Sequence, residues 1–108
     1  MALRWPNKDP DETLDYSIDW SRFLRPETTI SQIIWFVQDE NDVKTRFDVG
    51  DTVNGLSTTA QTISTNGTVA SIFLSGGTLG NRYTLSCNMT DNRAVSAERT
   101  VFIFIREQ

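Results

Sequence analysis

Residues 14–20 read Leu14-Asp15-Tyr16-Ser17-Ile18-Asp19-Trp20, so that a large apolar side chain occupies every second position and a polar one lies between each pair. Successive side chains of a β-strand point to opposite faces, and this period of two is that of a half-buried strand. The stretch therefore predicts a strand that buries one face in a core.

The same kind of signal continues toward the C-terminus. Over residues 83–90 apolar side chains again alternate with polar ones, the apolar set being Tyr83, Leu85, Cys87 and Met89. Residues 29–37 and 101–105 differ, because their β-branched and aromatic residues fall on both faces. We expect the latter two to be strands covered on both sides.

Three shorter segments complete the pattern. Asn66-Gly67 is a strong signal for a tight hairpin turn between strands at 56–64 and 68–74, and a short strand is expected at 43–49. Helical periodicity is not sustained, since Pro26 interrupts the nearest case at residues 20–27. The fold predicted is an all-β, immunoglobulin-like sandwich of about seven antiparallel strands.

Residues 1–13 are polar and rich in turn-forming residues, and they show no periodicity. We expect an extended, mobile N-terminal arm followed by one sandwich domain at residues 14–108. Trp5 stands out in this arm as an indole among polar neighbours. Because terminal segments are loose unless something ties them down, Trp5 either folds back onto its own domain or docks into a neighbouring subunit.

The charge of the chain restricts the class of partner. The net charge is −4 and the ten basic residues are scattered, so the average field repels a phosphate backbone and we expect no nucleic-acid partner. The N-terminus has no apolar run of the kind found in secretory signals or membrane anchors, which predicts a protein made in a cytosol with no membrane partner. The single cysteine, Cys87, excludes an intrachain disulfide.

The residue types also argue against catalysis. The sequence has no histidine, so triads of the Ser-His or Cys-His kind cannot be built, and Cys87 sits at an inward strand position as a small core hydrophobe. We predict no enzyme, no catalytic site, no cofactor and no metal. Calcium remains an alternative for one acidic loop, although the spacing is not that of an EF-hand, and its carboxylates are Asp39, Glu40, Asp42, Asp48 and Asp51.

Two stretches carry a resemblance to a known family. They read Lys8-Asp9-Pro10-Asp11-Glu12-Thr13-Leu14-Asp15-Tyr16-Ser17-Ile18-Asp19-Trp20 and Ser75-Gly76-Gly77-Thr78-Leu79-Gly80-Asn81-Arg82-Tyr83-Thr84-Leu85. With the spacing between them, they resemble the small immunoglobulin-like virion proteins of tailed bacteriophages that are described as fibre-to-tail adaptors, over most of residues 8–105.

The resemblance implies a virion structural protein, made in the bacterial host cytoplasm. Such a protein would link the tail, neck or baseplate to fibres, or decorate it, through contacts with other phage structural proteins. It implies several copies in a symmetric assembly and no enzymatic activity. The segment 39–54 is longer than the short link between strands that the family normally has at this place. A longer loop is a natural place for a specific contact.

The predicted partner-contact residues follow from the arm and from this loop. They are Trp5, Pro6, Lys8, Asp9, Asp42, Lys44, Arg46 and Phe47. The alternative function is a carbohydrate-binding or host-receptor-binding adhesion module of the same fold. It requires exposed aromatic side chains beside the acidic loop, and Trp5 is the candidate because Trp20 and Trp35 are expected in the core.

Overall fold

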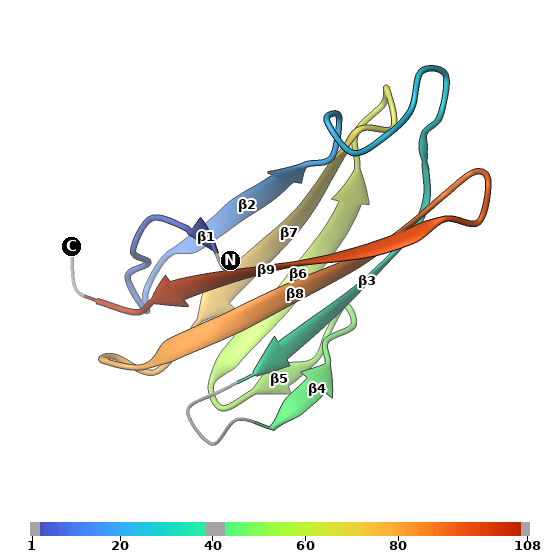
Figure 1. Cartoon of the computed structure of the whole chain (residues 1–108). Helices are drawn as coiled ribbons and strands as arrows, with labels where there is room; N and C mark the ends of the chain where they lie inside the picture. Colours follow the sequence, from blue (N-terminus) through green and yellow to red (C-terminus); the bar gives the residue numbers. More distant parts are fainter. Residues whose placement is uncertain (1–2, 39–42, 107–108) are drawn as a thin grey trace.

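The computed structural model describes residues 3–38 and 43–106, which form two β-sheets that face each other (Figure 1). Five strands form one sheet in the order β1 (Leu3–Arg4), β9 (Ser96–Phe104), β8 (Arg82–Asp91), β3 (Ile30–Gln38) and β4 (Lys44–Arg46). Four form the other in the order β2 (Thr13–Asp19), β7 (Val69–Gly76), β6 (Leu56–Ile63) and β5 (Thr52–Val53). The described residues contain no helix, so the prediction of an all-β sandwich is confirmed.

The pairing is antiparallel throughout except between β1 and β9, which run parallel. Each strand expected from the sequence has a counterpart, although β9 begins at Ser96 rather than at residue 101. The strands that were not predicted, β1 and β5, are two residues long each. A pair of residues is too short to show a period of two.

The core lies where the inward rows of the two sheets meet. In β8 the alternating residues Tyr83, Leu85, Cys87 and Met89 are all fully buried, and in β7 so are Ala70, Ile72 and Leu74. Trp35 of β3, also fully buried, pairs directly opposite Cys87. Burying a large apolar side chain contributes about 1.5–3 kcal/mol, so these rows supply much of the driving force for folding.

The expectation that β3 and β9 are covered on both sides is wrong. Their outward side chains Ile34, Phe36, Phe102 and Phe104 are half-buried rather than buried. Cationic side chains lie over the rings instead: Lys44 Nζ is 4.9 Å from the Phe36 centroid and Arg106 Cζ is 4.9 Å from that of Phe104. The long stems of such residues cover apolar surface while their charged heads stay in water, so an apolar run does not require a second layer of protein.

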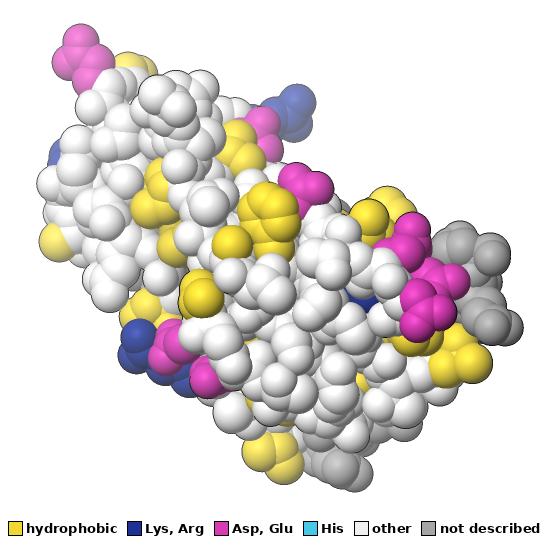
Figure 2. Space-filling view, turned by 180° about the vertical axis from the view of Figure 1, so that it is seen from behind, with side chains coloured by type: hydrophobic (Ala, Val, Ile, Leu, Met, Phe, Trp, Pro, Cys, Tyr) yellow, Lys and Arg dark blue, Asp and Glu magenta, His cyan; other side chains and the backbone are white. Residues whose placement is uncertain are grey.

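The molecule is elongated, with extents of 41 × 26 × 25 Å, and its two ends are built differently (Figure 1). We call the end that carries residues 5–12, 77–81 and 105–106, and at which β4 begins, the β4 end. From there the chain runs along one side of the sandwich, where Phe47 contacts Trp35 and Gln61 in the interiors of β3 and β6. We call the opposite end, formed by the β2–β3, β6–β7 and β8–β9 connections, the hairpin end. Viewed from the side of the four-stranded sheet, the surface between them consists largely of uncharged polar side chains and backbone (Figure 2).

Candidate functional site

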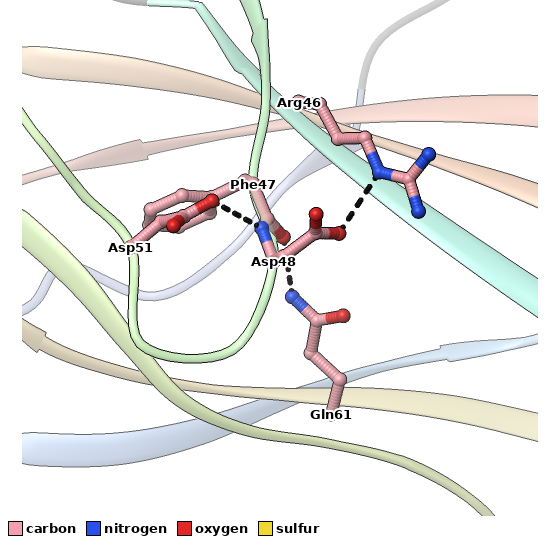
Figure 3. A network of polar contacts seen from close by, with 5 residues as sticks. All are labelled: Arg46, Phe47, Asp48, Asp51 and Gln61. Atoms are coloured by element: carbon pink, nitrogen blue, oxygen red, sulfur yellow. Dashed lines mark hydrogen bonds and ion pairs between the residues drawn. The ribbon is translucent and has the colours of Figure 1, made fainter.

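The connection from β4 to β5 is held in place by one aromatic anchor (Figure 3). The side chain of Phe47 is fully buried. Its backbone N–H donates to the carbonyl oxygen of Trp35 at 2.9 Å, and its own carbonyl accepts a hydrogen bond from the side-chain amide of Gln61. Phe47 was expected to contact a partner, but its burial makes it the residue that fixes the loop to the core.

The acidic residues of this loop are used within it. A carboxylate oxygen of Asp51 accepts the backbone N–H of Asp48 at 2.9 Å, and the carboxylate of Asp48 pairs with Nε of Arg46 at 3.0 Å (Figure 3). Among the described residues no group of three or more His, Cys, Asp or Glu side chains is arranged to hold a metal ion. The other carboxylates of the calcium alternative, Asp39, Glu40 and Asp42, lie outside the described residues, as does the contact expected of Asp42.

Around the anchor, the loop presents apolar and charged side chains to solvent. Val43 is 61% exposed and Val49 is 56% exposed. Lys44, Arg46 and Asp48 are exposed between them, and Lys44 Nζ also pairs with Glu98 at 2.9 Å. We call these five residues, Val43, Lys44, Arg46, Asp48 and Val49, the 43–49 surface. A rigid loop with exposed apolar residues rimmed by charge is typical of protein–protein contacts.

The two valines were missed in the sequence analysis. Valine favours strands, and a short strand over 43–49 would have given each valine a face of a sheet. In the structure β4 spans only Lys44–Arg46, which leaves Val43 before the strand and Val49 after it. The signal in the sequence that could have indicated their exposure was their position within an acidic loop.

Trp5 docks on its own domain. Its side chain is only 8% exposed, its ring stacks on that of Tyr16 at a centroid distance of 4.8 Å, and the ring of Trp35 lies 6.1 Å away. Its backbone N–H donates to the carbonyl oxygen of Phe102, which continues the parallel pairing of β1 with β9. Of the two alternatives for Trp5, packing on its own domain and docking into a neighbouring subunit, the structure shows the first.

Lys8 is also buried, and its ammonium group is bound by backbone carbonyls. Its Nζ donates to the carbonyl oxygens of Gly76 at 2.7 Å and of Asp9 at 2.8 Å. Burial lowers the pKa of this ammonium, while the nearby carboxylates of Glu12, Asp9 and Asp11 act in the opposite direction. The expectation of a loose arm is therefore wrong for its described part, because Trp5 and Lys8 are held in the packing of the sandwich.

The remaining residues of this segment form a turn at the β4 end. Pro6 is exposed and its carbonyl lies 3.5 Å from the hydroxyl of Tyr16. The side chain of Asp9 accepts the backbone N–H of Asp11 at 2.8 Å. Pro6 and Asp9 thus lie at the end of the molecule at which β4 and the 43–49 surface begin, and their role as contact residues stays a prediction.

The aromatic side chains do not form the platform that a sugar-binding module requires. Trp20 and Trp35 are fully buried, as expected, and Trp5 is buried as well. Among the described residues the one exposed large aromatic side chain is Phe23, which lies at the hairpin end and not beside the acidic loop. The observation that would favour the adhesion alternative is therefore missing from the described surface.

Cys87 behaves as a core residue. Its side chain is fully buried, and burial raises the pKa of its thiol to about 12, although the indole of Trp20 beside it acts in the opposite direction. A thiol that stays protonated at neutral pH is a poor nucleophile. No helix in the described part of the chain has the length and apolar character needed to span a membrane.

What the geometry offers is a rigid sandwich with an anchored, partly apolar loop, and comparison with known proteins gives this arrangement a context. No curated protein matches the sequence. Residues 8–104, most of the chain, match the family described as podophage GP4 fiber-tail adaptor protein gp77. The chain therefore belongs to this family of phage fibre-tail adaptors, and it is a structural component of the virion that acts through contacts with other phage structural proteins.

Proposed function

We propose that the chain is an immunoglobulin-like adaptor that contacts a tail or fibre protein through its 43–49 surface. The observation that carries the proposal is the anchored loop: Phe47 fixes the backbone, and Val43 and Val49 remain largely exposed on either side of the Arg46–Asp48 ion pair. An ordered loop loses little conformational entropy on binding, which favours a specific contact.

Three features support the immunoglobulin-like assignment. β1 and β2 belong to different sheets, with β1 parallel to β9, and the sheet that contains β8, β9, β3 and β4 faces the one that contains β2, β7 and β6. A buried tryptophan, Trp35, occupies an interior strand of one sheet, β3. The hydroxyl of Tyr83, near the start of β8, accepts the backbone N–H of Thr78 at 3.0 Å, five residues upstream, as in the tyrosine corner of such domains.

The same proposal assigns contact roles to Lys44 and Arg46, and to Pro6 and Asp9 at the rim of the β4 end. A partner that covers Val43 and Val49 would desolvate the Arg46–Asp48 pair, and such a pair confers specificity more than affinity. We further propose that several copies surround the tail and that none binds nucleic acid, since the net charge is −4.

The test is complementation of a phage that lacks the gene. Particles assembled with Val43→Asp/Val49→Asp should lose at least nine-tenths of either the adaptor or the fibre, measured by quantitative mass spectrometry of purified particles. The matched control is Thr59→Asp/Thr62→Asp, which adds the same charge at exposed positions of β6. Wild-type amounts of both proteins in the Val43→Asp/Val49→Asp particles would refute the proposed contact.

A further inference from the structure

The hairpin end is a second rigid surface, formed by three connections that are tied together. The backbone N–H of Asn92 donates to the carbonyl of Thr29 at 2.9 Å, and that of Ile30 donates to the carbonyl of Gly67 at 2.8 Å. Gly67 has a φ of +73°, and a Cβ built on it would lie 2.7 Å from Cβ of Thr29. The close approach of the β2–β3 and β6–β7 connections thus depends on a glycine at this position.

The β8–β9 turn is fixed by a carboxylate that faces its own backbone. Oδ1 of Asp91 accepts the N–H groups of Arg93 at 2.8 Å and Val95 at 3.0 Å, and the residue is 4% exposed. The hydrogen bond from Val95 and then that from Arg93 lower the pKa of this carboxyl, against the effect of burial, and the charges of Arg93 and Arg25 lower it further. Both arginines therefore lie near Asp91 while its oxygen is engaged with the turn.

This end exposes cations and apolar groups together. Phe23 is 38% exposed and packs edge-on against Trp20 at a centroid distance of 5.9 Å, and Val95 is 44% exposed. Arg22, Arg25 and Arg93 are exposed beside them. None of these three guanidinium groups forms an ion pair with any residue of the described chain.

Unpaired arginines gathered at one end are unexpected in a chain whose net charge is −4. The connections that form the hairpin end carry three arginines and one carboxylate, that of Glu27. Two further carboxylates end the flanking strands: Asp91 of β8 is buried, and Asp19 of β2 is exposed. Arginine and aromatic side chains are enriched where protein interfaces concentrate their binding energy. The cross-section of 26 × 25 Å is close to the roughly 600–800 Å² that one partner contributes to a small specific interface.

We propose that the hairpin end is a second docking surface, which binds an acidic and partly apolar patch on another phage structural protein. The inference rests on the proposed function and deepens it, because the adaptor then bridges two proteins through two separate surfaces, one at the hairpin end and one along the side that carries β4. Phe23 and Val95 supply the apolar contact, and Arg22, Arg25 and Arg93 pair with carboxylates of the partner. A protein is favoured over nucleic acid, because the exposed apolar side chains need a partner with apolar surface and the chain as a whole repels phosphate.

Complementation of the gene deletion tests this end with Arg25→Gln/Arg93→Gln. Two quantities are measured in purified particles, the adaptor per particle and the fibre per particle. The control is Thr59→Glu/Thr62→Glu, which shifts the net charge by the same amount away from both ends. Because the substituted side chains are exposed, the melting temperature of each purified variant should stay within a few degrees of wild type.

The expected result is that one of the two variants, Arg25→Gln/Arg93→Gln or Val43→Asp/Val49→Asp, lowers both the adaptor and the fibre at least tenfold, because the fibre is attached through the adaptor. The other variant should lower the fibre alone at least tenfold, and the control should lower neither. Wild-type amounts of both proteins with Arg25→Gln/Arg93→Gln would overturn the inference while leaving the proposed 43–49 contact standing. The same pattern of loss in both variants, either both proteins in each or the fibre alone in each, would overturn the bridging arrangement. Absence of the wild-type chain from particles would instead refute the proposed function.

A gel-shift arm separates protein from nucleic acid. The wild-type chain should not retard a 30-base-pair duplex at about 150 mM salt, where non-specific contacts are weak. Retardation that Arg25→Gln/Arg93→Gln abolishes, with both particle amounts unchanged, would assign the hairpin end to nucleic acid and contradict the inference.

Discussion

The N-terminal segment and the loop after β4 are similar in composition but have opposite structural roles. Both are polar stretches that contain one large aromatic residue, Trp5 in the first and Phe47 in the second. In the first, the aromatic residue is buried, and so is the charged side chain of Lys8. In the second, only the aromatic is buried, and its neighbours Val43 and Val49 are exposed.

The difference comes from what each backbone is paired with. The N-terminal segment runs beside β9, with backbone hydrogen bonds from Trp5 to Phe102 and from Lys8 to Phe104, so its side chains are drawn into the side of the sandwich. The loop has a three-residue strand, β4, and turns back on itself through Asp48 and Asp51. One segment therefore closes the core, while the other presents a surface.

Trp5→Ala should have the largest effect on stability. Truncating a buried tryptophan costs about 3–5 kcal/mol of unfolding free energy, measurable by urea denaturation. The matched variant Phe23→Ala, which truncates an exposed aromatic, should cost about 1 kcal/mol or less. Equal losses for the two variants would mean that the N-terminal segment does not close the core.

A spectroscopic readout sharpens that experiment. Burial, and secondarily the charge of Glu12, raise the pKa of Tyr16 to about 12, and Trp5 is the ring stacked on it. In Trp5→Ala, tyrosinate absorbance should show Tyr16 titrating closer to its ordinary value of 10.0. An unchanged titration would contradict the stacking.

The dependence of the unfolding free energy on alkaline pH tests whether Cys87 is buried in the core. The thiol of Cys87 has a pKa raised from 9.0 to about 12, so the unfolded chain releases its proton at a pH where the folded chain still holds it. Stability is therefore fully present below pH 9 and is lost as the pH rises toward 12, by about 2–3 kcal/mol between pH 8 and 11.

Urea denaturation at several pH values compares wild type with Cys87→Ala. The variant should be less stable at pH 8 because of the lost packing, yet it should lose less stability on going to pH 11. Parallel decline of the two proteins would show that Cys87 is not buried as described.

Lys8→Met keeps the apolar stem and removes the ammonium that bonds the carbonyls of Gly76 and Asp9. Hydrogen bonds to charged groups contribute about 1.5–3 kcal/mol, so a loss of about 2 kcal/mol is expected. The control Lys44→Met removes an exposed lysine that pairs with Glu98 and should cost less than about 1 kcal/mol. If Lys44→Met proves the more damaging of the two, the contrast between the segments fails.

The smallest effect is expected for Arg46→Ala in the loop. Exposed ion pairs contribute about 0–1 kcal/mol, so thermal unfolding should scarcely change when the partner of Asp48 is removed. A loss above about 2 kcal/mol would show that the Arg46–Asp48 pair holds the loop together and is not primarily a contact surface.

Strand positions could be predicted because each strand carries its own signal. The alternation around Tyr16 and Leu85 and the turn at Asn66-Gly67 need no information from elsewhere in the chain, and β2, β8 and the β6–β7 hairpin are where they were expected. The burial of Cys87 followed from the same alternation, and that of Trp35 from the apolar residues on either side of it.

The contact residues were harder to predict, because their exposure depends on partners distant in sequence. Trp5 and Lys8 are buried by β9 and by Gly76, and nothing in residues 1–13 indicates a parallel pairing with the last strand. Phe47 offered a local clue, since a lone aromatic in a polar loop is often an anchor. The arginines of the hairpin end are spread over two connections, and only the fold brings Arg25 and Arg93 close to the same carboxylate.

The most direct test of the account is a cryo-electron microscopy reconstruction of the phage tail at side-chain resolution. We predict one phage protein packed over Val43 and Val49, a different one packed over Phe23 and Val95, and Trp5 still stacked on Tyr16 of its own chain. A map in which Trp5 is inserted into a neighbouring molecule, or in which both the 43–49 surface and the hairpin end face solvent, would contradict it.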